Sequence, residues 1–259
     1  MRLPHGTGVV ALTPRMDGIG CKLALSDLRD LATAISRCRW MLDLDADPVA
    51  VDEQLGKDEA LAPLVAAKPG RRVPRTADAD EFALRAVLGQ RVPAAARTLA
   101  GRLVEAHGVP IQDPAGGLTH LFPDPVALAG LDPEKLAMPR ARRTAVTALV
   151  NALASGEVEL GAGSEWHTAR AQLSALPGIG RWTVETIAMR ALGDPDAFIP
   201  ADRGVRASAR VIGFPAGPPR RIARASAGTG SPSVTSDPVI SGRPLPGACA
   251  GSPGREWAR

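Results

Sequence analysis

A glycine-rich turn between two helical patterns is the part of this sequence best suited to hold an anion. Residues 176–183 read LPGIGRWT. Glycines allow positive φ angles and leave backbone N–H groups open to close approach, while the start of the next helix adds a partial positive charge. Such a turn can grip a nucleic-acid phosphate without reading bases. An ordinary glycine-terminated helix turn with no ligand has the same pattern, so both interpretations stay open here.

A carboxylate follows this turn along the chain. Asp202 lies twenty residues beyond Trp182, at the end of the stretch FIPAD, and a helical pattern begins there. An aspartate at a helix start is most often an N-cap, because its carboxylate accepts hydrogen bonds from the first amides of the helix. A chemical role for the same side chain can coexist with capping.

Taken together, the turn and the aspartate resemble the helix-hairpin-helix DNA glycosylase superfamily, in which such a hairpin precedes an essential aspartate at this spacing. More narrowly, they resemble the 3-methyladenine DNA glycosylase II family. The stretches LRAVLGQ at 84–90 and LAMPRAR at 136–142 agree with that family, and the resemblance covers residues 26–214. In bacteria this domain also occurs behind an alkyl-transferring regulator, so the chain is interpreted as a possible fragment of such a fusion.

The resemblance implies base-excision DNA repair by simple hydrolysis of the N-glycosidic bond of alkylated purines. Asp202 is the implied catalytic carboxylate, which stabilises an oxocarbenium-like transition state at the sugar C1′. Trp182 is the implied wall of the base pocket, because an indole face attracts a positively charged N-alkylated purine. Bifunctional members of the superfamily carry a lysine nucleophile at that position, and a tryptophan cannot replace it. The expected product is therefore an abasic site without strand cleavage.

The residues that the resemblance assigns to DNA binding lie in the hairpin and in a bend near residue 90. They are Gly178, Ile179, Gly180, Arg181, Thr183, Gln90 and Arg91. The bend corresponds to the region that wedges into the duplex where a base leaves the stack, and Arg91 stands where the family often has an apolar residue. A cluster of three further arginines at a helix start contacts phosphate or forms a solvated face: Arg140, Arg142 and Arg143.

The elements expected around these residues are mainly helical. An apolar stripe with helical spacing begins after Ser26, and an Asp78-x-x-Glu81 capping arrangement opens the helix that precedes the bend. Pro93 fits the first position of a helix over 94–107, and another runs over 139–154 before a stop at Gly156. Further helices are expected over 166–176, 181–192 and 202–212. The sequence therefore predicts a mainly α protein with a helix-hairpin-helix glycosylase domain over residues 26–214.

The two ends of the chain differ from this helical body. Residues 9–12 and 21–25 favour two strands around a turn, which cannot be stable alone, so residues 1–25 are interpreted as a remnant of an N-terminal β-domain. Residues 215–259 are rich in glycine, serine and proline and lack an apolar period, which predicts a disordered or frameshifted tail.

Composition limits the alternatives. The chain has 259 residues and a net charge of +4, with −1 over residues 1–80 and +5 over the rest, which favours a polyanionic partner. We expect duplex DNA with alkylated bases as that partner, a cytoplasmic monomer, and no membrane span. The four histidines and three cysteines show no metal-ligand spacing, and no Walker loop is present, so we expect no metal and no cofactor.

Two other functions remain open at this stage. One is a non-catalytic or inactive truncated helix-hairpin-helix module that only binds DNA. The other is a glycosylase for mismatched or oxidised bases, against which Trp182 and the absence of cluster cysteines argue.

Overall fold

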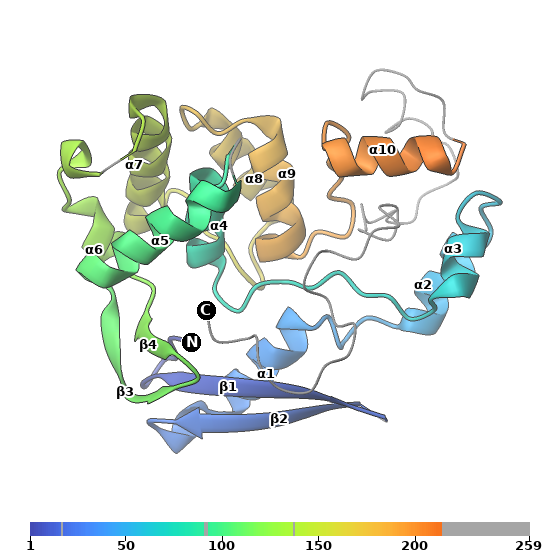
Figure 1. Cartoon of the computed structure of the whole chain (residues 1–259), viewed down its shortest axis with the longest axis horizontal. Helices are drawn as coiled ribbons and strands as arrows, with labels where there is room; N and C mark the ends of the chain where they lie inside the picture. The colour runs from blue at the N-terminus through green and yellow to red at the C-terminus, as the bar shows by residue number, and fades with distance from the viewer. Residues whose placement is uncertain (17, 91–92, 137, 214–259) are drawn as a thin grey trace.

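The computed structural model describes residues 1–16, 18–90, 93–136 and 138–213. The helices form the body of the molecule, and a β-hairpin lies along one edge (Figure 1). The strands are β1 (Gly8–Arg15), β2 (Gly18–Leu25), β3 (Val109–Ala115) and β4 (Leu118–Leu121). The α-helices are α1 (Leu31–Met41), α2 (Pro48–Leu55), α3 (Ala62–Ala67), α4 (Ala79–Leu88), α5 (Pro93–His107), α6 (Pro125–Ala129), α7 (Arg140–Ser155), α8 (Trp166–Ala175), α9 (Arg181–Ile187) and α10 (Arg203–Val211). The predicted mainly α fold is confirmed.

Local sequence signals place several helix ends correctly. The Asp78 carboxylate accepts a hydrogen bond of 3.0 Å from the Glu81 amide at the start of α4. Gly156 ends α7 with a φ of +75°, a left-handed conformation that glycine adopts without strain. The helix expected over 181–192 is observed in two parts, since α9 continues into a π-helix, Ala188–Leu192.

The main core lies between α4, α7, α8 and α9. Its most deeply buried large side chains are Leu84, Leu88, Leu149, Leu173 and Ile187. Burial of each such side chain contributes about 1.5–3 kcal/mol to folding. Because α4 and α9 both pack on this core, the bend that follows α4 lies beside the turn that precedes α9.

The N-terminal region pairs β1 with β2 antiparallel, with Gly8 opposite Leu25, as the predicted strands require. This hairpin is tied to the rest of the molecule. The buried Asp30 carboxylate accepts both of its hydrogen bonds from the His5 amide, at 3.1 and 3.2 Å. The guanidinium of Arg2 lies 3.5 Å from the Asp124 carboxylate, which caps α6.

The sequence did not predict the second hairpin, which pairs β3 with β4 and has an irregular register between Pro110 and Ala115. Prolines at 110 and 114 remove two backbone donors, so the segment lacks the regular alternation that marks a strand. A two-stranded sheet tolerates them because both strands are edge strands.

The predicted tail, residues 215–259, lies outside the described residues, and the proposed boundaries at residues 25 and 214 stay predictions. None of the helices in the described part of the chain combines the length and the apolar composition needed to cross a membrane.

Candidate functional site

The turn between α8 and α9 approaches α7 closely. Gly178 has a φ of +80°, and a Cβ atom on it would lie only 2.7 Å from the Cβ atom of Ala145. Both its backbone conformation and its packing therefore require glycine at this position. The predicted hairpin is thus held against the body of the protein through Gly178.

Gly180 is placed differently from Gly178. Its φ of −86° and ψ of 165° are available to any residue, so Gly180, unlike Gly178, does not use the positive φ that glycine allows. A Cβ atom there would meet no heavy atom within 4 Å. Among the described residues, the amides of Gly180 and Arg181 have no hydrogen-bond acceptor. The start of α9 therefore presents free N–H groups to an open space.

Two of the predicted DNA-binding side chains face the interior. Ile179 is 6% exposed and packs in the main core, and its amide donates to the Leu176 carbonyl at 3.2 Å. Thr183 is 2% exposed. Arg181, in contrast, projects into solvent, with its Nε atom 3.9 Å from the Glu185 carboxylate. Of these three side chains, only that of Arg181 is open to a ligand in this structure.

Gln90 ties the bend after α4 to the hairpin. Its Nε2 atom donates to the Gly178 carbonyl at 3.1 Å and to Thr183 Oγ1 at 3.0 Å. The Gln90 carbonyl in turn accepts a hydrogen bond of 2.8 Å from the Arg142 guanidinium. Gln90 therefore orients the hairpin in this structure, while its predicted contact with DNA stays untested. Arg91 lies outside the described residues.

The three arginines at the start of α7 separate into different roles. Arg142 reaches the bend, and Arg143 forms an ion pair of 2.7 Å with Glu134. Arg140 is exposed and has no ion-pair partner among the described residues. Phosphate contact by these arginines, one of the two interpretations left open, stays a prediction.

The side chains of Trp182, in the first turn of α9, and Asp202, at the start of α10, are in contact. The indole Nε1 atom donates a hydrogen bond of 3.3 Å to Asp202 Oδ2, and Trp182 is 38% exposed. Asp202 Oδ1 accepts from the amides of Gly204 and Val205, at 2.8 and 3.1 Å, and so caps α10. Oδ1 therefore caps the helix, and Oδ2 lies against the indole. The predicted proximity of positions 182 and 202 is confirmed.

The charge of Asp202 is not neutralised by a cationic side chain within the described residues. Its partners are an indole N–H and two backbone amides, which orient the carboxylate without cancelling its charge. A carboxylate held in this way can stabilise positive charge that develops next to it. The neighbouring indole can hold a planar cationic group.

The sequence did not point to Arg170, whose guanidinium forms ion pairs with both Glu185 and Asp194. A signal was present, because Glu185 interrupts an otherwise largely apolar helix over residues 182–189. A charged residue on a buried helix face needs a partner of opposite charge. Which residue supplies it, however, depends on tertiary structure.

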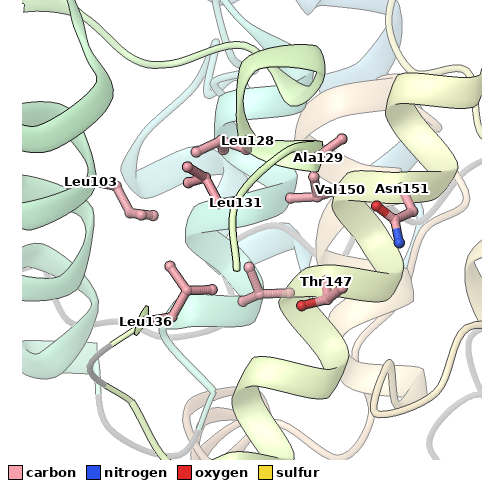
Figure 2. Close-up of a pocket in the computed structure, with 9 residues that line it drawn as sticks. Leu103, Leu128, Ala129, Leu131, Leu136, Thr147, Val150 and Asn151 are labelled. Atoms are coloured by element: carbon pink, nitrogen blue, oxygen red, sulfur yellow. The ribbon is translucent and has the colours of Figure 1, made fainter. Parts of the chain in front are cut away.

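The cavity in Figure 2 lies elsewhere, between α5, α6 and α7. Leucines such as Leu103 and Leu136 line it, and its polar lining residues are Thr147 and Asn151. None of its lining residues belongs to the hairpin or to the contact between Trp182 and Asp202. The cavity therefore supplies no acid, base or nucleophile to the candidate site. Among the described residues, no cluster of histidine, cysteine and carboxylate side chains is arranged to hold a metal ion.

Known proteins resemble this chain in sequence and in fold. Residues 1–78 match the family model described as the AlkA N-terminal domain. The chain is 54% identical over 217 residues to a Mycobacterium tuberculosis protein named "Probable bifunctional transcriptional activator/DNA repair enzyme AlkA". That alignment covers 83% of this chain and 44% of the relative.

A second relative is DNA-3-methyladenine glycosylase 2 of Escherichia coli, 34% identical over 175 residues, which are 66% of this chain and 59% of the relative. The chain thus spans about half the length of the relatives that it matches. Among solved structures, a 3-methyladenine DNA-glycosylase from Archaeoglobus fulgidus has a TM-score of 0.72 at 20% identity, over 90% of this chain and 81% of that one. This likeness shows that the fold is shared.

Proposed function

Because the chain is homologous to AlkA and to DNA-3-methyladenine glycosylase 2, we propose that it excises alkylated purines from duplex DNA. The reaction is hydrolysis of the N-glycosidic bond, and the substrates are bases of the 3-methyladenine and 7-methylguanine type. The relatives' names supply the reaction class, and the site supplies the residues. We also propose that the protein is a monomer and that it acts in the cytoplasm.

The contact between Trp182 and Asp202 is the observation that carries the proposal. It places a carboxylate that has no cationic partner in the described part of the chain 3.3 Å from the nitrogen of an exposed indole. A flipped nucleotide with its base against the indole face brings its sugar towards the carboxylate. Both groups suit a positively charged reactant, the indole for the alkylated base and the carboxylate for the sugar.

In the proposed reaction the bond between C1′ and the base nitrogen breaks first. The electron pair of that bond stays with the base, which leaves as a neutral purine because alkylation had made it cationic. Asp202 stabilises the oxocarbenium-like sugar through its Oδ2 atom. A water oxygen then bonds to C1′ and gives up a proton, and the product is an abasic site. The base needs no protonation, so the site requires no general acid.

The backbone of the hairpin supports a positioning role on DNA. The amides of Gly180 and Arg181 have no acceptor within the described residues and suit a phosphate oxygen. Alanine at position 180 keeps the backbone N–H but places a Cβ atom in the open space beside it, where it would obstruct a phosphate. The substitution is therefore expected to weaken duplex binding about tenfold, the equivalent of one hydrogen bond to a charged group. The free energy of unfolding should change by less than ~0.5 kcal/mol, because a Cβ atom there meets nothing.

Gly178→Ala is the matched control within the same turn. The added Cβ atom would clash with Ala145 at a φ of +80°, so this variant should lose about 2 kcal/mol of stability. Fluorescence anisotropy with labelled duplex and urea unfolding measure the two effects. If Gly180→Ala binds DNA as tightly as the unsubstituted protein does, the hairpin does not contact DNA as proposed.

The deciding experiment measures abasic-site formation by the 259-residue chain on three duplexes: methylated, 8-oxoguanine-containing and undamaged DNA. We expect abasic sites on methylated DNA alone, and no strand cleavage, since position 182 has no amine nucleophile. Binding without excision on every duplex would favour the alternative of a non-catalytic DNA-binding module. Excision of 8-oxoguanine would favour an oxidised-base glycosylase.

A further inference from the structure

A largely buried ion network connects the helix that carries Trp182 with the segment that leads to Asp202. Arg170 on α8 donates from Nη1 to Glu185 Oε2 at 2.8 Å and from Nε to Asp194 Oδ2 at 2.9 Å, and its Nη2 atom lies 2.6 Å from the same Oδ2 atom. The side chains of Arg170, Glu185 and Asp194 are 21%, 11% and 6% exposed. One guanidinium therefore joins α8, α9 and the segment that follows the π-helix.

Both carboxylates also hold the backbone of the segment that leads to Asp202. Glu185 Oε2 accepts the amide of Phe198 at 3.3 Å, and Asp194 Oδ1 accepts the amide of Asp196 at 2.8 Å. The Asp194 amide donates to the Ala188 carbonyl in the π-helix. Phe198 precedes Asp202 by four residues. The network is thus connected by hydrogen bonds to the chain that carries the candidate catalytic carboxylate.

The same network fixes the other partner of the catalytic contact. Glu185 lies one helical turn after Trp182 on α9. Arg170 consequently holds both elements of the contact. Its ion pair with Glu185 fixes the helix that carries the indole, and its ion pair with Asp194 fixes the segment that carries the carboxylate. The segment between Gly193 and Asp202 contains no regular helix or strand, and its Ala197 packs in a second apolar cluster with residues of α8 and the π-helix.

An arginine is needed for this geometry. Its planar group donates in fixed directions, so it can bind two carboxylates on different elements at once. A lysine keeps the positive charge but offers a single nitrogen atom, which cannot take the separate places of Nε and Nη1 against the two carboxylates. Stability alone does not account for such a cluster, because the desolvation of buried ions offsets much of their attraction.

We propose that Arg170 is a positioning residue for base excision, which holds the segment over residues 194–202 so that Asp202 faces Trp182. This inference rests on the proposed function for its effect on catalysis. Its structural part, that Arg170 orders this segment, is independent of which reaction the protein performs. The experiment therefore has one readout for each part.

The test compares Arg170→Lys with Arg85→Lys, the same substitution in the exposed pair of Arg85 and Glu81 on α4. Under single-turnover conditions with methylated duplex, Arg170→Lys is expected to lower the excision rate by about tenfold to hundredfold, since small misplacements of reacting groups have effects of this size. Duplex affinity should stay within about twofold, because the hairpin is held separately through Gln90. Arg85→Lys should alter neither quantity.

Amide hydrogen exchange supplies the readout that does not depend on activity. In Arg170→Lys, peptides over residues 194–202 should exchange faster, while peptides over 81–90 match the unsubstituted protein. If Arg170→Lys fails to fold, Glu185→Gln takes its place, since the amide keeps an oxygen for Phe198 and loses only the charge. The same pattern with a smaller factor is then expected.

Several results overturn the inference. One is unchanged exchange over 194–202 in the folded variant. Another is a rate loss matched by an equal loss of duplex affinity and thermal stability, which indicates a structural role alone. A third is an effect no larger than that of Arg85→Lys. If the unsubstituted protein excises no base, the proposed function fails, and the exchange experiment still decides whether Arg170 orders the segment.

Discussion

Two aspartates on one segment, Asp194 and Asp202, show how differently this fold treats the same side chain. Each uses Oδ1 to accept backbone amides. The Oδ2 atom of Asp194 lies against the Arg170 guanidinium and is buried. The Oδ2 atom of Asp202 faces an indole N–H beside solvent. The fold neutralises the first charge and keeps the second available.

This difference assigns a different task to each carboxylate. A charge already paired with a guanidinium gains little when a second cation approaches, because its field is largely cancelled. A charge that is oriented but unpaired can act on a cationic transition state. Asp194 therefore suits a structural role and Asp202 a catalytic one, and substitutions at the two positions should affect different properties.

Asp202→Asn should have the largest effect on excision. The amide keeps the shape and the N-cap, since asparagine caps helices as well as aspartate, so the free energy of unfolding should change by less than ~0.5 kcal/mol. The loss of the negative charge should lower the single-turnover rate by at least about a hundredfold. Excision kinetics and urea unfolding check the two halves of this expectation. An active Asp202→Asn variant would exclude Asp202 as the catalytic group.

Asp194→Asn should show the opposite balance. It leaves the buried Arg170 with one anionic partner and weakens a charged hydrogen bond, so we expect a loss of about 2 kcal/mol in the free energy of unfolding. Urea denaturation monitored by circular dichroism measures this loss. A stability equal to that of Asp202→Asn would show that the two carboxylates do not differ as proposed.

Trp182→Phe tests the partner that orients Asp202. Phenylalanine keeps an aromatic face for the base but lacks the Nε1–H that lies 3.3 Å from Asp202 Oδ2. The excision rate should fall by about threefold to tenfold, as expected for one hydrogen bond to a charged group near the surface. Single-turnover kinetics on methylated duplex measure the change. A loss as large as that of Asp202→Asn would indicate that the indole has a further role in the reaction.

Local signals in the sequence explain how much of this site was predictable. The turn at 177–180 and Asp202 stand out because glycine, proline and capping aspartate act through their own backbone, within a few residues. For the same reason Asp78 and Gly156 mark helix ends correctly. The proximity of Trp182 and Asp202, however, was implied by the family resemblance and by no local signal.

Long-range partners could not be predicted from the sequence. Arg170 lies 24 residues before Asp194, and nothing in its neighbourhood selects that carboxylate among the many in the chain. The hydrogen bond from Arg142 to the Gln90 carbonyl spans 52 residues, and no local signal in the sequence indicates it. The conformation of Gly180 could not be predicted either, because glycine permits a positive φ without requiring it.

A third aspartate sharpens the comparison, and its substitution has the smallest expected effect on excision. Asp80, in the first turn of α4, has no cationic partner among the described residues. Burial, together with the nearby negative charge of Asp78, raises the pKa of Asp80 to about 6. Since this pKa lies above its ordinary value near 3.8, protonation favours the folded state. The resulting stability is present below about pH 4 and is lost as the pH rises through about 6.

Asp80→Asn removes this dependence, because the amide is neutral at every pH. The variant should therefore gain stability over the unsubstituted protein at pH 8 and lose that advantage at pH 4, with a difference in melting temperature of about 6 °C. Thermal unfolding from pH 4 to pH 8 measures it. A constant difference across this range would mean that Asp80 is as well solvated as a surface carboxylate. In that case the charge of Asp80 would have no effect on stability. Of Asp80 and Asp202, which both lack a cationic partner among the described residues, only Asp202 would then have a charge with a role.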